Sequence, residues 1–218
     1  EALGNFYTSL YQPFLAETAS VQAVAFLIRK MVDENQPVSS LALSPMAVDS
    51  HEFKILNAGI RAAGLAAFPF FRFGNWYLTV AEPWTEYFAS RPSQVRNTIK
   101  RKSKAFDAEG GVIELITGGD RVEYGIGAYH TIYLASWKVP EPYPDFMPGL
   151  IRMLASHGWL RLGVASLNGQ PVAAQVWIVA YGKASIFKLA HNEDYKRYSA
   201  GSLLTVMLMQ HVMEVDGV

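Results

Sequence analysis

The chain has 218 residues, half of them hydrophobic, so it is long enough for one large or two small domains with a sizeable core. Basic and acidic residues balance at 19 each, which removes the simplest argument for a nucleic-acid or acidic-membrane partner. The absence of cysteine excludes disulfides, thiolate metal sites and cysteine nucleophiles. Because the apolar runs fall short of the roughly 20 residues of a membrane-spanning helix and no signal peptide is recognisable, we expect a cytoplasmic protein.

The first 90 residues predict a mixed α/β unit that precedes a second domain over residues 91–218. Apolar residues recur at helical spacing in residues 20–34 and 50–64. Three shorter segments have the apolar pattern of strands: residues 38–43, 66–73 and 76–80. Gly74-Asn75 suits a tight hairpin turn between the last two of these segments.

After a short connector at residues 84–90, the most basic segment of the chain occupies residues 91–109 and predicts a helix that ends at Gly110-Gly111. Its apolar residues share one face, and its cations cover the others. The ordinary interpretation is a solvated helical face, and the functional one is a surface that binds phosphate or another anion. Three cations are the candidates for that contact: Arg96, Lys100 and Arg101.

The second domain is predicted to be built on antiparallel strands. Its expected elements are a strand at 112–117, a helix at 120–137, a proline-rich loop at 140–148, a helix at 150–157, and strands at 160–167, 171–181 and 184–190. Asn168-Gly169 and Gly182-Lys183 supply hairpin turns between the last three strands. The predicted fold class is α/β of the α+β type, with a mixed, largely antiparallel central sheet flanked by helices.

Residues 184–214 have the pattern of a buried strand, a polar loop and an apolar helix. Ser199 or Ser202 can cap this helix. The free N–H groups and the positive dipole end of a helix start attract anions, and Gly201 lets the phosphates of a ligand approach the backbone. A capped core helix after an ordinary loop explains the same residues equally well.

The motifs of several familiar chemistries are missing from the sequence: GxxxxGK[ST], GxGxxG, GxSxG and HExxH. The five histidines are scattered, so we predict no metal site. His191, Glu193 and Asp194 cluster where a ligand would meet the helix start, and each is a candidate general base or water-orienting group. Tyr195 and Tyr198 are candidate proton donors. The alternative for the first three residues is a loop that simply faces water, and the alternative for the two tyrosines is packing.

Four segments of the second domain carry a family resemblance: RNTIKRK, YLASWK, LRLGVASLNGQPVAAQVWIVAYGKASIFKLAHN and YKRYSAGSLL. Together they are similar to the GNAT-type acyltransferase domain of the CelD/BioF2-like proteins, a group related to the FemAB peptidyltransferases. That family has a Y-x-x-x-S-P-G-x-x-L loop that enters a helix, and this chain has Ala200 in place of the proline. The resemblance implies that residues 1–90 are a degenerate GNAT-like half. The end at Asp216-Gly217-Val218 predicts a domain that is C-terminally incomplete.

The resemblance implies an N-acyltransferase that moves an acetyl or acyl group from acyl-coenzyme A to an amine by direct attack. The donor would contact the strand before the loop and the start of the helix: Leu189, Ala190, Lys196, Arg197, Ser199, Ala200, Gly201 and Ser202. Proton transfer is expected of His191, Glu193 and Tyr198. The acceptor, for which the family suggests an amine of an envelope or polysaccharide precursor, would meet Arg96, Lys100, Arg101, Trp137 and Lys138.

Two other functions fit the same residues. A FemAB-like transferase would take its acyl group from aminoacyl-tRNA, and the basic helix would then contact the RNA backbone. A binding module that keeps the fold without turnover would also tolerate Ala200 and an incomplete domain. Steep salt dependence of tRNA binding would distinguish the first from a coenzyme A enzyme, and ligand binding without acyl transfer would identify the second.

Overall fold

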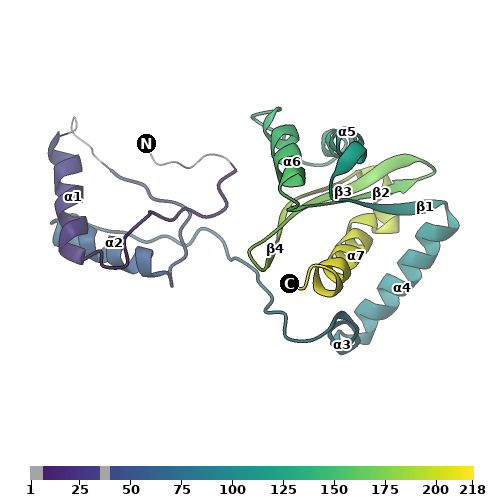
Figure 1. Cartoon of the computed structure of the whole chain (residues 1–218), viewed down its shortest axis with the longest axis horizontal. Helices are drawn as coiled ribbons and strands as arrows, with labels where there is room; N and C mark the ends of the chain where they lie inside the picture. Colours follow the sequence, from purple (N-terminus) through teal and green to yellow (C-terminus); the bar gives the residue numbers. More distant parts are fainter. Residues whose placement is uncertain (1–6, 35–39) are drawn as a thin grey trace. The chain divides into compact units, whose positions relative to one another are not determined.

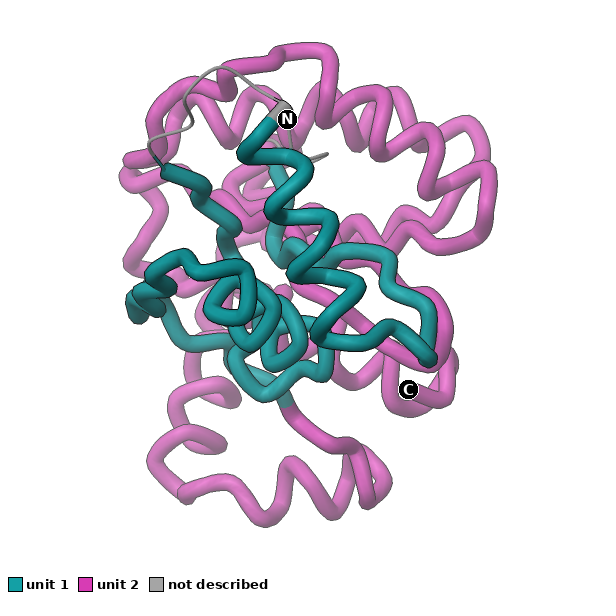
Figure 2. The backbone as a smooth tube through the Cα atoms, turned by 90° about the vertical axis from the view of Figure 1, so that its left-hand side faces the viewer, with its two compact units in different colours: residues 1–77 teal, residues 78–218 magenta. Residues whose placement is uncertain are grey.

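The computed structural model, drawn in Figure 1, describes residues 7–34 and 40–218. It divides into two units, Glu1–Tyr77 and Leu78–Val218 (Figure 2). The division falls before the boundary after residue 90 that the sequence suggests, so the segment from Leu78 to Ser90 belongs to the C-terminal unit in the structure. The division into functional domains stays a prediction.

Two helices form the regular part of the N-terminal unit, α1 (Val21–Glu34) and α2 (His51–Ala62), and both predicted helices are confirmed. Ser50 caps α2, because its Oγ accepts a hydrogen bond from the Phe53 N–H at 3.1 Å. The two helices pack closely at Gly59, where an added Cβ would lie 2.5 Å from a methyl group of Val24.

The strands predicted for the N-terminal unit are wrong wherever the structure describes them. Residues 40–80 contain no strand, so the hairpin at Gly74-Asn75 does not form, and the first two residues of the segment 38–43 lie outside the described residues. Apolar side chains in this stretch point into solvent: Phe70 is 87% exposed and Trp76 97%. A strand needs a paired neighbour and a buried face, and this stretch has neither in the described unit.

The C-terminal unit confirms the predicted fold class. Its sheet runs in the order β1-β2-β3-β4 with every pair antiparallel, and its strands are β1 (Gly111–Ile116), β2 (Leu160–Leu167), β3 (Gln170–Ala180) and β4 (Lys183–His191). Its helices are α3 (Trp84–Ser90), α4 (Ser93–Ala108), α5 (Val122–Leu134), α6 (Phe146–Ser156) and α7 (Ala200–Glu214). Two short 3₁₀ segments, η1 (Gly119–Arg121) and η2 (Glu193–Tyr198), precede α5 and α7.

Two expectations about the connections are corrected. The connector at residues 84–90 is helix α3, whose first residue, Trp84, is buried. The loop predicted at 140–148 is shorter, because α6 already begins at Phe146 and tolerates Pro148 in its first turn, where a missing N–H is harmless.

Both tight hairpins of the sheet use residues in the left-handed region. Asn168 and Gly169 have φ of 49° and 81°, which joins β2 to β3 as predicted. The next turn uses Tyr181 and Gly182, with φ of 53° and 67°, so it lies one residue before the predicted Gly182-Lys183. The ladder between β3 and β4 also shifts register, between Val176 and Trp177.

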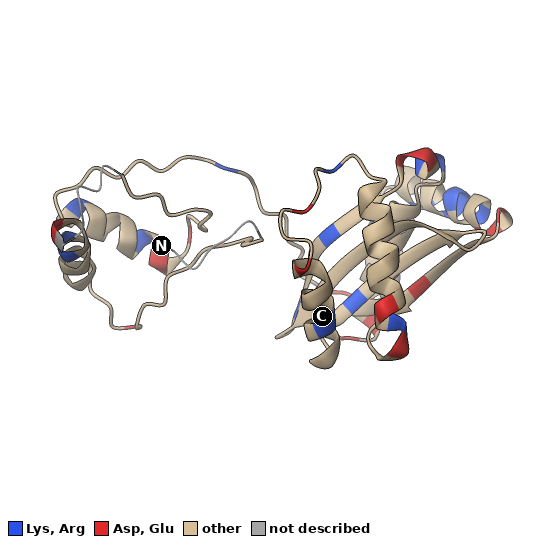
Figure 3. Ribbon diagram, turned by 90° about the horizontal axis from the view of Figure 1, so that it is seen from above, with Lys and Arg blue, Asp and Glu red and all other residues tan. Residues whose placement is uncertain are grey.

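Helices cover both faces of the sheet. In Figure 1, α5 and α6 lie on one face and α4 and α7 on the other. Close approach explains two glycines: an added Cβ at Gly125 of α5 would lie 2.6 Å from Leu162, and one at Gly163 of β2 would lie 2.9 Å from Leu204 of α7. Helix α4 carries the basic segment, and Figure 3 shows its Lys and Arg residues.

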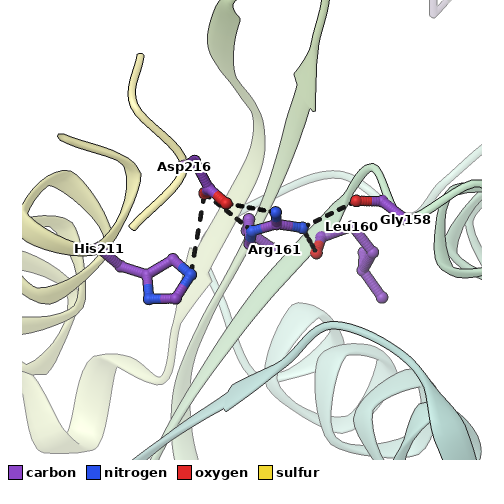
Figure 4. Close-up of polar contacts among 5 residues, drawn as sticks. All are labelled: Gly158, Leu160, Arg161, His211 and Asp216. Atoms are coloured by element: carbon purple, nitrogen blue, oxygen red, sulfur yellow. Dashed lines mark hydrogen bonds and ion pairs between the residues drawn. The ribbon is translucent and has the colours of Figure 1, made fainter. Parts of the chain in front are cut away.

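The far end of α7 is tied to the start of β2 by an ion pair (Figure 4). The Arg161 guanidinium donates to Asp216 through Nε at 2.9 Å and through a terminal nitrogen at 2.5 Å. The other terminal nitrogen donates to the carbonyls of Gly158 and Leu160, and the His211 ring lies 3.8 Å from the Asp216 carboxylate. Both charged side chains are largely buried, at 13% and 9% exposure.

Candidate functional site

The chain enters α7 through a sharp turn. Asn192 starts η2 by accepting the Asp194 N–H at 2.9 Å, and Ser199 then adopts the left-handed conformation with φ of 57°. The Ser199 carbonyl accepts the N–H groups of Ser202 and Leu203. Ser199 occupies the capping position as predicted, but its side chain makes no capping hydrogen bond, because the reversed φ leaves this role to its carbonyl. The earliest N–H groups of α7 have no partner within the helix.

Gln175 of β3 fixes the first turn of α7 against the sheet. Its Nε2 donates to the Gly201 carbonyl at 2.7 Å and to Thr205 Oγ1 at 2.8 Å, while its Oε1 accepts from Trp177 Nε1 at 2.9 Å. Gln175 is 3% exposed, and all its described hydrogen bonds are made with the protein. Because this contact engages a carbonyl, it does not occupy the N–H groups of the turn.

Open space surrounds the α carbon of Gly201. An added Cβ at this position would meet nothing within 4 Å, although the neighbouring Ala200 and Tyr198 are buried. A ligand can therefore reach the backbone of the first turn while the residues beside it pack into the core. This combination of free N–H groups, dipole end and open backbone is the arrangement that binds phosphate at helix starts.

Positive charge lies beside this turn. A hollow of about 340 Å³ is bordered by Arg101, Lys102 and Arg197, with Glu109 as its acidic member. Lys102 Nζ donates to the Arg197 carbonyl, which joins α4 to η2. Of the cations predicted on α4, Arg101 is the one that borders this hollow.

At the end of β4, two of the three predicted proton-transfer residues meet. His191 Nε2 lies 3.0 Å from Glu193 Oε1, and the His191 ring contacts the Trp137 ring at a centroid distance of 4.6 Å. Tyr198 lies elsewhere: it is buried against Phe106, and its hydroxyl accepts a hydrogen bond from Arg197 at 2.6 Å. Its burial favours the packing alternative, and its catalytic role stays a prediction.

A cluster of charged and phenolic groups forms where the α5–α6 connection returns over β4. Lys188 Nζ pairs with Glu141 at 3.1 Å, and the Glu141 carboxylate also accepts from the Tyr129 hydroxyl at 3.3 Å. Lys138 lies 5.9 Å from the centre of the Tyr133 ring. Burial, followed by repulsion from Lys188, lowers the pKa of Lys138, and burial, followed by the charge of Glu141, raises the pKa of Tyr133.

A family model matches most of the C-terminal unit. Residues 93–218, more than half of the chain, match the model of the acetyltransferase (GNAT) domain. The chain belongs to this family. A search of curated proteins gives no match.

Two solved structures show a distant similarity to this GNAT domain. The ribosomal-protein-S18-alanine N-acetyltransferase of Escherichia coli is 19% identical and aligns over 47% of this chain and 59% of its own, with a TM-score of 0.36. The C-terminal DUF2156 domain of a proposed lysylphosphatidylglycerol synthetase from Agrobacterium fabrum is 18% identical over 54% of this chain and 38% of its own, with a TM-score of 0.40. The chain therefore spans less than two thirds of either structure.

The structure distributes the predicted site residues of the GNAT domain over three places. Residues expected to contact the donor lie along β4 and around the start of α7, as their position in the sequence requires. Trp137 and Lys138 lie with His191 and the Lys188–Glu141 pair. Arg96 and Lys100 are on a different side of α4 from Arg101 and border a groove with α3 and the later turns of α7.

Sequence reasoning missed three residues that shape this site. Gln175, Glu141 and Lys188 act through partners far along the chain, such as the Gly201 carbonyl, which is 26 residues from Gln175. A polar residue inside an otherwise apolar strand was the available signal for Gln175, since a buried amide needs partners. Within residues 7–34 and 40–218, no group of three or more His, Asp or Glu is arranged to hold a metal ion. Across the same residues, no helix has the length and apolarity to cross a membrane.

Proposed function

We propose that this chain is an N-acyltransferase that moves an acetyl or acyl group from acyl-coenzyme A to an amine. The observation that carries the proposal is the start of α7, where free N–H groups, open backbone at Gly201 and a carbonyl held by Gln175 occur together. A GNAT domain that supplies such a helix start has a ready site for the pyrophosphate of the donor. We also propose the CelD/BioF2-like group as the subfamily.

The donor lies along β4 and ends on α7 in this proposal. Its pyrophosphate meets the backbone N–H groups at Ala200 and Gly201, and its outer phosphate meets Arg101 and Arg197 across the small hollow. Its pantetheine arm follows β4, whose outer edge pairs with no strand among the described residues. Leu189 is 39% exposed on this strand and offers apolar contact to the arm.

The chemistry is direct attack of the acceptor amine on the thioester carbonyl. A C–N bond forms, the C–S bond breaks, coenzyme A leaves as its thiolate, and the amine loses its extra proton. His191 accepts that proton, and the nearby Glu193 carboxylate stabilises the imidazolium that results. Backbone N–H groups at the edge of β4 stabilise the negative charge that develops on the carbonyl oxygen.

The acceptor approaches from the side of Trp137 and Lys138. The exposed Trp137 ring against His191 offers an apolar or sugar-binding surface next to the proposed base. An amine on an envelope or polysaccharide precursor suits this surface. The Lys188–Glu141 pair holds the α5–α6 connection over β4, which keeps Trp137 and Lys138 in place.

Donor binding is tested by calorimetry with acetyl-coenzyme A and the variant Gly201→Glu. The added carboxylate occupies the open space and repels the pyrophosphate, so we expect binding to be lost. Gly127→Glu is the matched control, because Gly127 of α5 is also a helical glycine with open space where a Cβ would be added. Wild-type binding that Gly201→Glu leaves intact would refute the proposed donor site.

Turnover is tested separately, since a protein can bind the donor without transferring its acyl group. Replacing His191 by Gln should lower the rate of acyl transfer by about 10²–10⁴-fold and leave donor affinity unchanged. Absence of coenzyme A binding in the wild-type chain would favour the aminoacyl-tRNA alternative if tRNA binds with steep salt dependence. Binding without any transfer would favour the non-catalytic module.

A further inference from the structure

A groove lies among α3, α4 and α7. The groove has a volume of about 840 Å³, which is within the range of small-molecule sites. Its α7 side is formed by Val206 and Gln210, one to three turns beyond Gly201, so it is separate from the proposed donor site. No residue of the small hollow beside the start of α7 borders it.

The floor of the groove is apolar and partly aromatic. Trp84 and Phe88 stack on each other with a centroid distance of 5.1 Å and an interplanar angle of 23°. Ile99 of α4 and Val206 of α7 complete this floor, and both are partly buried. A ligand that rests here covers apolar surface that is otherwise open to water.

The rim of the groove is cationic. Arg96, Lys100 and Lys104 follow one another at intervals of four residues on α4, about 6 Å apart along the helix axis, and Asp107 is the acidic residue of the lining. Arg96 is steadied by donation of its Nε to the Arg91 carbonyl at 3.1 Å. Neither lysine makes an ion pair with any residue that the structure describes. Like charges at this spacing repel, and a bound anion would relieve that repulsion.

We propose that this groove binds a phosphorylated small molecule with an apolar body. The phosphate lies between Lys100 and its two cationic neighbours, and the apolar body lies on Phe88, Ile99 and Val206. A nucleotide and an alkyl or acyl phosphate share this chemistry, because each joins a phosphate to a group with a face or chain that can pack on apolar side chains. The site does not depend on acyl transfer and can bind its ligand in the absence of any donor.

The test is calorimetry on the full chain at low salt with three probes: inorganic phosphate, AMP, and decyl phosphate below its micelle-forming concentration. We expect AMP or decyl phosphate to bind at least about tenfold more tightly than inorganic phosphate, since the apolar body adds buried surface. Preference for AMP assigns a nucleotide, and preference for decyl phosphate assigns an alkyl or acyl phosphate.

Variants locate the binding. Lys100→Gln should weaken it at least about threefold, since one direct cation contact is lost. Lys183→Gln, which removes an exposed lysine at the first position of β4, should leave it unchanged. Ala89→Glu, at an exposed position of the lining on α3, should abolish it. Gly201→Glu should leave it intact.

Three results would overturn the proposal. The first is that neither organic phosphate binds more tightly than inorganic phosphate. The second is an equal effect of Lys100→Gln and Lys183→Gln, which would show that only net charge matters. The third is loss of binding in Gly201→Glu, which would place the probes on the proposed donor site instead.

Discussion

The two ends of α7 are held to the same sheet by different chemistry. At the first turn, a neutral amide of Gln175 binds the Gly201 carbonyl from beneath. At the last turn, the charged pair of Arg161 and Asp216 links the residues after the helix to the start of β2. The first contact is made by one buried side chain with three partners, and the second by two nearly buried charges.

The difference follows from what each end must leave free. An anionic ligand at the helix start would be repelled by a carboxylate clamp and diverted by a cationic one, whereas an amide that binds a carbonyl does neither. The far end presents carbonyls, and no proposed ligand approaches it. A charged pair can therefore serve there, and its guanidinium also satisfies the Gly158 and Leu160 carbonyls.

The largest expected effect comes from breaking the charged end. Asp216→Asn removes the carboxylate and leaves the Arg161 guanidinium nearly buried without its counter-ion, so we expect a loss of about 3 kcal/mol in the free energy of unfolding. Urea unfolding followed by fluorescence measures this loss. Affinity for acetyl-coenzyme A should remain close to wild type, because the start of α7 keeps its own anchor.

Glu123→Gln is the matched control for that variant. Glu123 makes the same two-pronged contact with Arg152, at 2.7 and 2.8 Å, but both side chains are more than half exposed. Solvent screens such a pair, so this substitution should change stability far less than Asp216→Asn. A similar loss of unfolding free energy in the two variants would contradict the claim that burial makes the Arg161–Asp216 pair the more important one for stability.

A smaller loss of stability and a larger loss of donor affinity are expected from the neutral end. Gln175→Leu leaves the buried Trp177 Nε1 without its acceptor, which costs about 1–3 kcal/mol. It also frees the Gly201 carbonyl from the sheet, so the N–H groups of that turn lose their fixed direction. Calorimetry with acetyl-coenzyme A should show weaker binding than in Gln94→Leu, the same change at an exposed position of α4.

This pair of variants separates the two ends. If Asp216→Asn weakened donor binding as much as Gln175→Leu, the helix would respond as one rigid body and the two anchors would be equivalent. If Gln175→Leu lowered stability but left donor affinity unchanged, the amide would have a structural role only and no part in the donor site.

Local sequence patterns were sufficient for the sheet and for most helices. Strands β2, β3 and β4 agree with prediction to within one residue at each end, because apolar runs end at residues that favour a positive φ, such as Asn168-Gly169. The same signals failed for residues 66–80, where aromatic residues alternate but no neighbouring strand pairs with them. Strand propensity describes a residue's fit to a sheet and cannot supply the second strand.

The anchors of α7 were beyond sequence reasoning for a related reason. Arg161 and Asp216 are 55 residues apart, and their pairing depends on how α7 returns across β2. The free start of α7 was predictable, since the turn formers and Gly201 are local. The contact that anchors this turn was not predictable, because no residue near Gln175 in the sequence indicates that its partner is the Gly201 carbonyl.

The smallest expected effect concerns Lys138, a partly buried cation in the same unit as α7. It tests whether the charge of this lysine lowers the free energy of unfolding. Burial and repulsion from Lys188 lower the pKa of Lys138, so the folded protein releases a proton more readily than the unfolded chain. The resulting destabilisation is complete below the lowered pKa and disappears as pH rises toward the ordinary value of about 10.4. Lys138→Met should therefore be more stable than wild type at pH 7, by less than about 1 kcal/mol because solvent screens the site, and the advantage should shrink by pH 9.5. Urea unfolding at both pH values measures the difference, with Lys183→Met as the exposed control. A loss of stability in Lys138→Met at both pH values would contradict the prediction. It would mean that packing of the lysine's aliphatic stem stabilises the fold more than its charge destabilises it.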